Sequence, residues 1–215
     1  MLTTTQDFDD PNEAAAIEPS TPRVLLLLAS ALERLVTRNV QLVDQTVSNS
    51  TPNGFLGAGV NLKVFDGVRA PNISIPKYLE RLYKYTECSP SCFVVAYIYI
   101  DRLVHKHPEM MLLHHNVHRL VLTTLVVASK ILDDVQYNNA FYAKVGGVSN
   151  VELNRLELEL LFLLDFKVTV SSHVFESYCW YLEKDDVKTC NTNTNRIIQD
   201  VLHFDLNLIT DINAT

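Results

Sequence analysis

The sequence lacks the patterns of common catalytic sites. Its 215 residues contain no glycine-rich phosphate loop followed by Lys-Ser/Thr, no Ser/His/Asp order and no zinc-protease helix motif. Neighbouring carboxylates such as Asp133 and Asp134 diverge by about 100° on a helix, so they do not face each other as an acid–base pair would. No residue therefore stands out as catalytic, and we expect a protein that is not an enzyme and carries no cofactor.

Cysteine and histidine are too few and too scattered to indicate a metal site or a disulfide framework. The four cysteines form no CxxC motif, which is typical of reduced, mostly buried thiols in a cytosolic or nuclear protein. The strongest metal candidate is the segment HHNVH, where His114 and His118 lie four residues apart. Carboxylates of matching spacing are missing nearby, so we interpret the segment as an ordinary loop and helix start.

The sequence also lacks long apolar runs and a basic field. No stretch approaches the roughly 20 apolar residues that span a bilayer, and the amino terminus has no basic segment followed by an apolar one. Of the net charge of −7, five negative charges fall within residues 1–20, which leaves −2 for the remainder. We therefore expect no membrane partner, no nucleic-acid partner and a location in the nucleus or cytoplasm, without secretion.

The most informative stretch is 116–134, NVHRLVLTTLVVASKILDD, whose apolar residues cover nearly every face of a helix. A helix that is apolar all round is surrounded by other helices in a soluble protein. Its apolar run is too short for a bilayer and ends in charged residues. The pattern predicts the buried axis of a helical domain.

Local start and stop signals divide the remaining chain into helices. Two helix starts are marked by Ser74 with Pro76 and by Ser89 with Pro90. Gly146-Gly147 is a glycine stop, and Ser149 with Glu152 forms a capping box. No alternating strand of useful length occurs, so the class is all-α: five helices around an apolar third one, flanked by one helix on each side. The predicted divisions are a disordered acidic lead (1–20), a flanking helix (21–47), a flexible linker (48–73), the five-helix body (74–168), and a helix with a tail (169–215).

Two charges stand out because they lie within apolar helices. Lys130 follows LVVAS, and Glu157 lies among leucines in LNRLELELLFLLDF. An isolated buried charge is costly, so each needs a partner or a solvent opening. From pattern alone, a last-turn cation stabilised by the helix dipole and an exposed helix face with Glu152 and Arg155 are the favoured interpretations.

A resemblance to a known family changes which interpretation of Lys130 and Glu157 is favoured. The segments that carry it are YIYIDRL, VVASKILDD, NNAFYAKVGGVS and ELNRLELELLFLLDF. Together they resemble a cyclin box. The longer segments RAPNISIPKYLERLYKYTECSPSCFVVAYIYIDRL and YAKVGGVSNVELNRLELELLF resemble the plant U-type (P-type) cyclins, which are related to the yeast phosphate-signalling cyclins. The likeness is ungapped, spans about residues 22–182 and implies a regulatory subunit that activates a cyclin-dependent kinase in cell-cycle or phosphate-linked control.

The resemblance also implies a partner-binding site. The lysine and glutamate with which cyclins bind main-chain groups beside the PSTAIRE-type helix of the kinase fall on Lys130 and Glu157. Neighbouring apolar residues are expected to supply anchoring area: Val127, Ile131, Leu161 and Phe166. Asp134 resembles an acid that replaces activation-loop phosphate by pairing with kinase arginines. The chain is expected to be a monomer alone and a heterodimer with its kinase.

Departures from the family pattern leave other questions open. The first helix of the body, SIPKYLERLYKY, lacks the MRAIL-type docking sequence, so recruitment of Arg-x-Leu substrates is not expected. Asp101 matches an aspartate of the family that usually pairs with an arginine of the first helix. This sequence has no clear equivalent of that arginine, and Arg81 and Arg69 are the candidates. The length of the chain suits a single cyclin box. Two alternatives remain: a helical adaptor without a kinase, and a DNA-binding fold like that of transcription factor IIB, which the weak basic charge disfavours.

Overall fold

The computed structural model describes residues 21–49, 62–134 and 137–189, and these residues are all-α, as predicted. The elements in chain order are α1 (Arg23–Asn49), the 3₁₀ helix η1 (Leu62–Phe65), α2 (Ile75–Thr86), α3 (Pro90–Lys106), α4 (Val117–Leu132), α5 (Asn139–Gly146), α6 (Asn150–Leu163) and α7 (Ser172–Thr189). No β-strand occurs within these ranges, and none of their helices is long and apolar enough to cross a membrane. The predicted disordered lead and the end of the tail lie outside the described residues.

The ends of the short helices follow from local chemistry. Ser149 Oγ accepts a hydrogen bond from the backbone N–H of Glu152 at 3.1 Å, which caps the start of α6. Asn138 caps α5 in the same way through the N–H of Phe141 at 3.0 Å. At the end of α5, Gly147 adopts the left-handed conformation with φ of 75° that glycine tolerates without strain. These caps explain why the sequence signals located the helices to within one or two residues.

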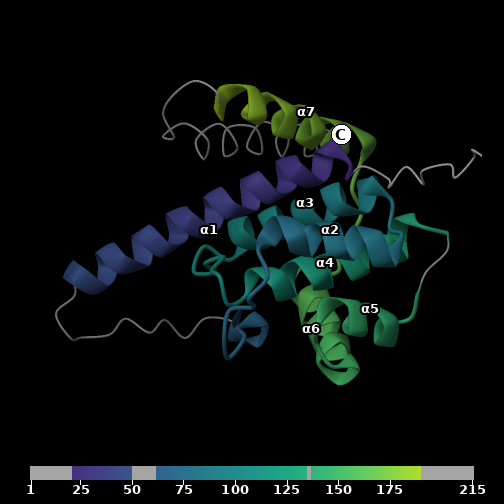
Figure 1. Ribbon diagram of the computed structural model, residues 1–215, viewed down its shortest axis with the longest axis horizontal. Coiled ribbons are helices and arrows are strands. Elements are labelled where there is room, and N and C mark those ends of the chain that lie inside the picture. The colour runs from purple at the N-terminus through teal and green to yellow at the C-terminus, as the bar shows by residue number, and fades with distance from the viewer. Residues whose placement is uncertain (1–20, 50–61, 135–136, 190–215) are drawn as a thin grey trace, which may run out of the picture.

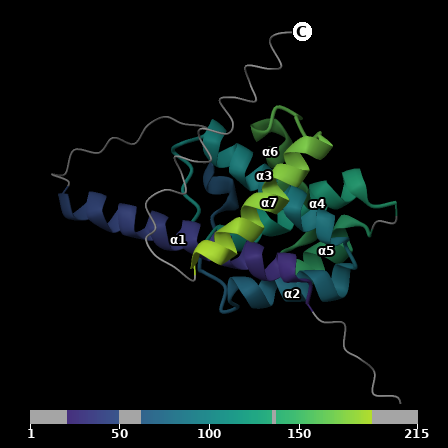
Figure 2. The same ribbon diagram turned by 90° about the horizontal axis from the view of Figure 1, so that it is seen from above.

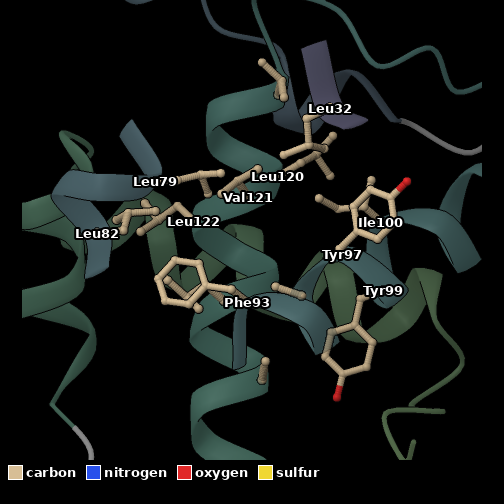
Figure 3. Packing of buried hydrophobic residues seen from close by; sticks show 14 of the residues in the cluster. Leu32, Leu79, Leu82, Phe93, Tyr97, Tyr99, Ile100, Leu120, Val121 and Leu122 are labelled. Atoms are coloured by element: carbon tan, nitrogen blue, oxygen red, sulfur yellow. The ribbon is translucent and has the colours of Figure 1, made fainter. Parts of the chain in front are cut away.

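Helix α4 is the axis of the fold. It packs against α2, α3, α5, α6 and η1, and every residue from Leu120 to Ser129 is buried. Figure 3 shows side chains of α1, α2 and α3 converging on it, including Leu32, Leu79 and Phe93. This continuous burial confirms the prediction of a central helix and leaves only the two ends of α4 near solvent.

The flanking helices α1 and α7 lie together rather than on opposite sides. Helix α7 lies across α1 in both views and packs on α1 and α3 (Figures 1 and 2). The amino-terminal half of the apolar stripe of α1 is buried, with Leu28 and Leu32 each only 2% exposed, while Val40 and Val43 are only partly buried. Helix α1 is therefore part of the core, because its stripe fills the surface that α2 and α3 leave open.

Part of the predicted linker over residues 48–73 packs against the core within the residues that the structure describes. Phe65 in η1 is fully buried, and η1 packs against α4 and α6. The N–H of Gly67 donates to the carbonyl of His115 at 2.8 Å, and Asp66 lies 3.3 Å from His115 Nε2. A single buried aromatic ring and these loop contacts fix the segment, although its glycines and prolines resemble those of a free connection.

Candidate partner-binding surface

Lys130 and Glu157 meet at the surface of the helical body. Lys130 lies in the last turn of α4, and Glu157 lies in the middle of α6. The ammonium Nζ donates to Glu157 Oε1 at 2.5 Å, with the two side chains 33% and 16% exposed. Each charge thus finds the partner that its apolar surroundings require, and neither is sealed beneath the chain.

Asn139, which the sequence reasoning missed, completes this cluster. It is the first residue of α5, and its Nδ2 donates to Glu157 Oε2 at 2.6 Å and to Asn154 Oδ1 at 2.7 Å. Both oxygens of the Glu157 carboxylate are therefore bound, one by α4 and one by α5. The segment NNAF carries both asparagines, but the capping role of Asn138 and the cross-helix role of Asn139 appear only in the structure.

A buried polar network fixes the end of α4 next to Lys130. Tyr142 OH donates to Ser129 Oγ at 2.9 Å, and Cys92 Sγ donates to Asp133 Oδ2 at 3.2 Å. Burial raises the pKa of Cys92 to about 12, which keeps its thiol protonated as a donor. The backbone N–H of Ser89 also points to Asp133, at 3.4 Å. The start of α3, the end of α4 and α5 are thereby tied together.

The structure divides the predicted apolar anchors into accessible and inaccessible ones. Ile131 and Phe166 are 53% and 56% exposed, and Leu161 is partly buried against the core. Val127 is only 3% exposed and belongs to the core, contrary to its predicted place on the surface. It lies three residues before Lys130, within the stretch of α4 that is enclosed on all sides.

Several exposed apolar residues near the cluster were not predicted. Leu158, Phe162 and Leu132 are 53%, 59% and 46% exposed. Leu158 and Phe162 share one face of α6, and large apolar side chains exposed together mark contact sites for other proteins. The repeat of Leu158 and Phe162 at a spacing of four residues was the available signal in the sequence. Asp134 is exposed just after α4, so its predicted role remains a prediction.

Asp101 does not pair with either of the arginines suggested for it. Its Oδ2 accepts from Tyr178 OH of α7 at 2.6 Å and lies 3.3 Å from His105 Nδ1. Arg81 instead donates from Nε to the carbonyl of Val145 at 2.8 Å. Helix α7, rather than the first helix of the body, supplies the partner, which the family pattern did not indicate.

His118 of the segment HHNVH has a structural role in the core. His118 is 8% exposed, and its Nε2 donates to the carbonyl of Ile73 at 2.9 Å, while the ring packs edge-on against Tyr78. The described residues contain no group of three or more His, Cys, Asp or Glu placed to hold a metal ion. Cys88, Cys92 and Cys179 are free thiols, and Cys190 lies outside the described residues.

Comparison with known proteins identifies the fold. The cyclin family model matches residues 22–168. The chain belongs to the cyclin family. Cyclin-U1-1 of Arabidopsis thaliana is 58% identical over 188 residues, which cover 86% of this chain and 85% of that protein. Cyclin-P3-1 of Oryza sativa subsp. japonica is 49% identical over 76% of this chain and 65% of that protein. Cyclin-U4-1 of Arabidopsis thaliana is 45% identical over 76% of each.

These relatives confirm the expected resemblance to U-type and P-type cyclins. The matched range begins at residue 22, so it includes α1 as well as the five-helix body. As a cyclin, the protein is regulatory rather than enzymatic, and the partners of the family are kinases. The division into box, linker and flanking segments remains a prediction, as does the role of each site residue.

Proposed function

We propose that this cyclin binds and activates a cyclin-dependent kinase of the PSTAIRE type through the surface around Lys130 and Glu157. The observation that supports the proposal most is the meeting of these two charges, from α4 and α6, beside exposed apolar side chains. Half-buried charges make strong hydrogen bonds to main-chain groups once a partner excludes water. The ring of Phe166 and the side chain of Ile131 would supply apolar contact area next to them.

Activation would follow from a population shift in the kinase. Binding beside the movable helix favours the kinase conformation in which that helix lies inward and its glutamate pairs with the catalytic lysine. The cyclin contributes no atom to phosphoryl transfer. We propose a heterodimer with the kinase, a monomer in its absence, and a location in the nucleus or cytoplasm, where such kinases act.

Affinity measurements with alanine variants test the proposal. We expect Lys130→Ala and Glu157→Ala each to weaken binding of a PSTAIRE-type kinase by about 2–5 kcal/mol, because each leaves a charge unpaired in a desolvated interface. Isothermal titration calorimetry would measure the affinity, and circular dichroism would verify unchanged helical content.

Two exposed residues on the same body serve as matched controls. Lys144 on α5 and Arg155 on α6 are exposed, and their alanine variants should bind the kinase like the wild type. Equal affinity of Lys130→Ala, Glu157→Ala and the controls would contradict the proposed site. Absence of binding by the wild type would favour the alternative, a helical adaptor with a cyclin fold.

A further inference from the structure

We propose that the carboxyl-terminal half of α3 acts as a clamp that fixes the turn after α6 and so aims Phe166 at the kinase before binding. The clamp consists of Tyr99, Arg102 and Lys106, which we interpret as positioning residues. The inference rests on the proposed function, because the direction of Phe166 matters only if a kinase binds at this surface.

The turn after α6 has an unfavourable backbone conformation. Asp165 and Phe166 follow one another in the left-handed region, with φ of 51° and 58°. Residues other than glycine rarely adopt this backbone conformation, and two such residues in succession need support from their surroundings. Two backbone bonds close the turn: the N–H of Phe166 donates to Leu161 at 2.8 Å, and that of Asp165 donates to Phe162 at 3.0 Å.

Helix α3 supplies the support through side-chain donors. Lys106 Nζ donates to the carbonyl of Leu163 at 2.8 Å and pairs with Asp165 Oδ2 at 2.5 Å. This hydrogen bond lowers the pKa of Asp165, so the carboxylate stays ionised. Lys106 therefore holds both the carbonyl of Leu163, the last residue of α6, and Asp165, the first left-handed residue after it.

The clamp continues beyond the turn along the same helix. Arg102 Nη1 donates to the carbonyls of Lys167 and Thr169, both at 3.1 Å. Tyr99 OH donates to the carbonyl of Val168 at 2.6 Å, and burial raises the pKa of this phenol to about 12, which keeps it protonated. Two further positions of α3, Tyr99 and Arg102, thus bind the segment on the carboxyl side of Phe166, while Lys106 binds the turn on its amino side.

The consequence is an aromatic anchor that is ordered yet open to a partner. The rings of Phe162 and Phe166 meet edge to face with centroids 5.3 Å apart, and the residues are 59% and 56% exposed. Such an edge-to-face pair limits the orientations of both rings. Fixing a contact residue before association removes part of the ordering cost of binding, which raises affinity without a new contact.

The variant Asp165→Gly separates positioning from stability. Glycine adopts a positive φ freely, so the fold should keep its thermal stability, whereas the turn loses the carboxylate that Lys106 holds. We expect the Kd for a PSTAIRE-type kinase, measured by calorimetry, to rise about 3- to 10-fold. Lys106→Met should raise the Kd in the same range, and Lys84→Met, at an exposed lysine in the last turn of α2, should leave it unchanged.

A double-mutant cycle shows whether the turn acts through the ring. In the Phe166→Ala background, Asp165→Gly should have no further effect on the Kd, because the side chain to be aimed is absent. An unchanged Kd for Asp165→Gly alone, or an effect that persists in full without the ring, would overturn the clamp. If Lys130→Ala and Phe166→Ala weaken binding while Asp165→Gly does not, only the clamp fails. If the wild type binds no kinase, the proposed function fails together with it.

Discussion

Lys130 and Glu157 already satisfy one another in the free cyclin. Their bond, with the second Glu157 oxygen held by Asn139, means that a partner does not meet two unpaired charges. Main-chain groups of a kinase would instead join an ordered cluster that still has donor and acceptor capacity. Removing one member should therefore disturb both the free protein and the complex.

At the same scale, His118 should make the stability of this cyclin depend on pH. Burial lowers the pKa of His118 below the 6.5 of a free imidazole, so the folded state disfavours its protonated form. Above pH 6.5 both folded and unfolded chains hold a neutral ring. Below pH 6.5 the unfolded chain takes up the proton first, so this contribution to stability falls until the lowered pKa of the folded state is passed.

Urea unfolding across pH 5 to 7.5 would measure this dependence. We expect the free energy of unfolding to fall on acidification, and the His118→Gln variant to show a flatter profile in the same range. A profile for His118→Gln as steep as that of the wild type would assign the effect to other groups. His173, which is exposed on α7, offers His173→Gln as the matched control, which should keep the wild-type slope.

At the scale of elements, the sequence predicted where each helix lies along the chain better than how the helices pack against one another. Helix ends followed from local signals such as Ser149 and Gly147, which act within a few residues along the chain. The burial of Phe65 could not be predicted in this way, because it depends on which helices surround it. The left-handed turn at Asp165 and Phe166 also had no signal, since it uses no glycine and is held by side chains of α3.

The candidate site shows the same difference between features set by local sequence and features set by helix packing. Pattern alone favoured separate, ordinary roles for Lys130 and Glu157, and only the family resemblance brought them together. Asn139 was missed because its role depends on the contact of α5 with α6, two helices whose relative placement no local signal determines.

The burial of α1 leads to a prediction for that element. Leu32 is 2% exposed in the core, so Leu32→Ala should lower the free energy of unfolding by about 2–5 kcal/mol through lost burial and a cavity. Leu26→Ala on the same helix, where the side chain is 56% exposed, should change it by less than about 0.5 kcal/mol. Chemical denaturation would measure both. Equal, small effects would show that α1 is a dispensable appendage rather than a part of the core.

At the scale of the whole molecule, the described body is one continuous core with a charged cluster and exposed apolar side chains at one end of its central helix. The core cluster includes buried residues of every helix from α1 to α7. A regulatory protein of the cyclin family needs no chemistry of its own. Its effect on a kinase would instead come from presenting an ordered surface, with α4 fixing Lys130 and α6 fixing Glu157 and the aromatic pair.

The most direct measurement compares the wild type with the charge-reversed variant Lys130→Glu/Glu157→Lys. Denaturation would report its stability, and calorimetric titration with a PSTAIRE-type kinase its affinity. If the pair binds the kinase, the double reversal should recover stability that each single reversal loses, because opposite charges meet again, yet it should not recover affinity. Kinase affinity that returns to the wild-type value together with stability would show that the pair only holds α4 to α6, and would contradict the account.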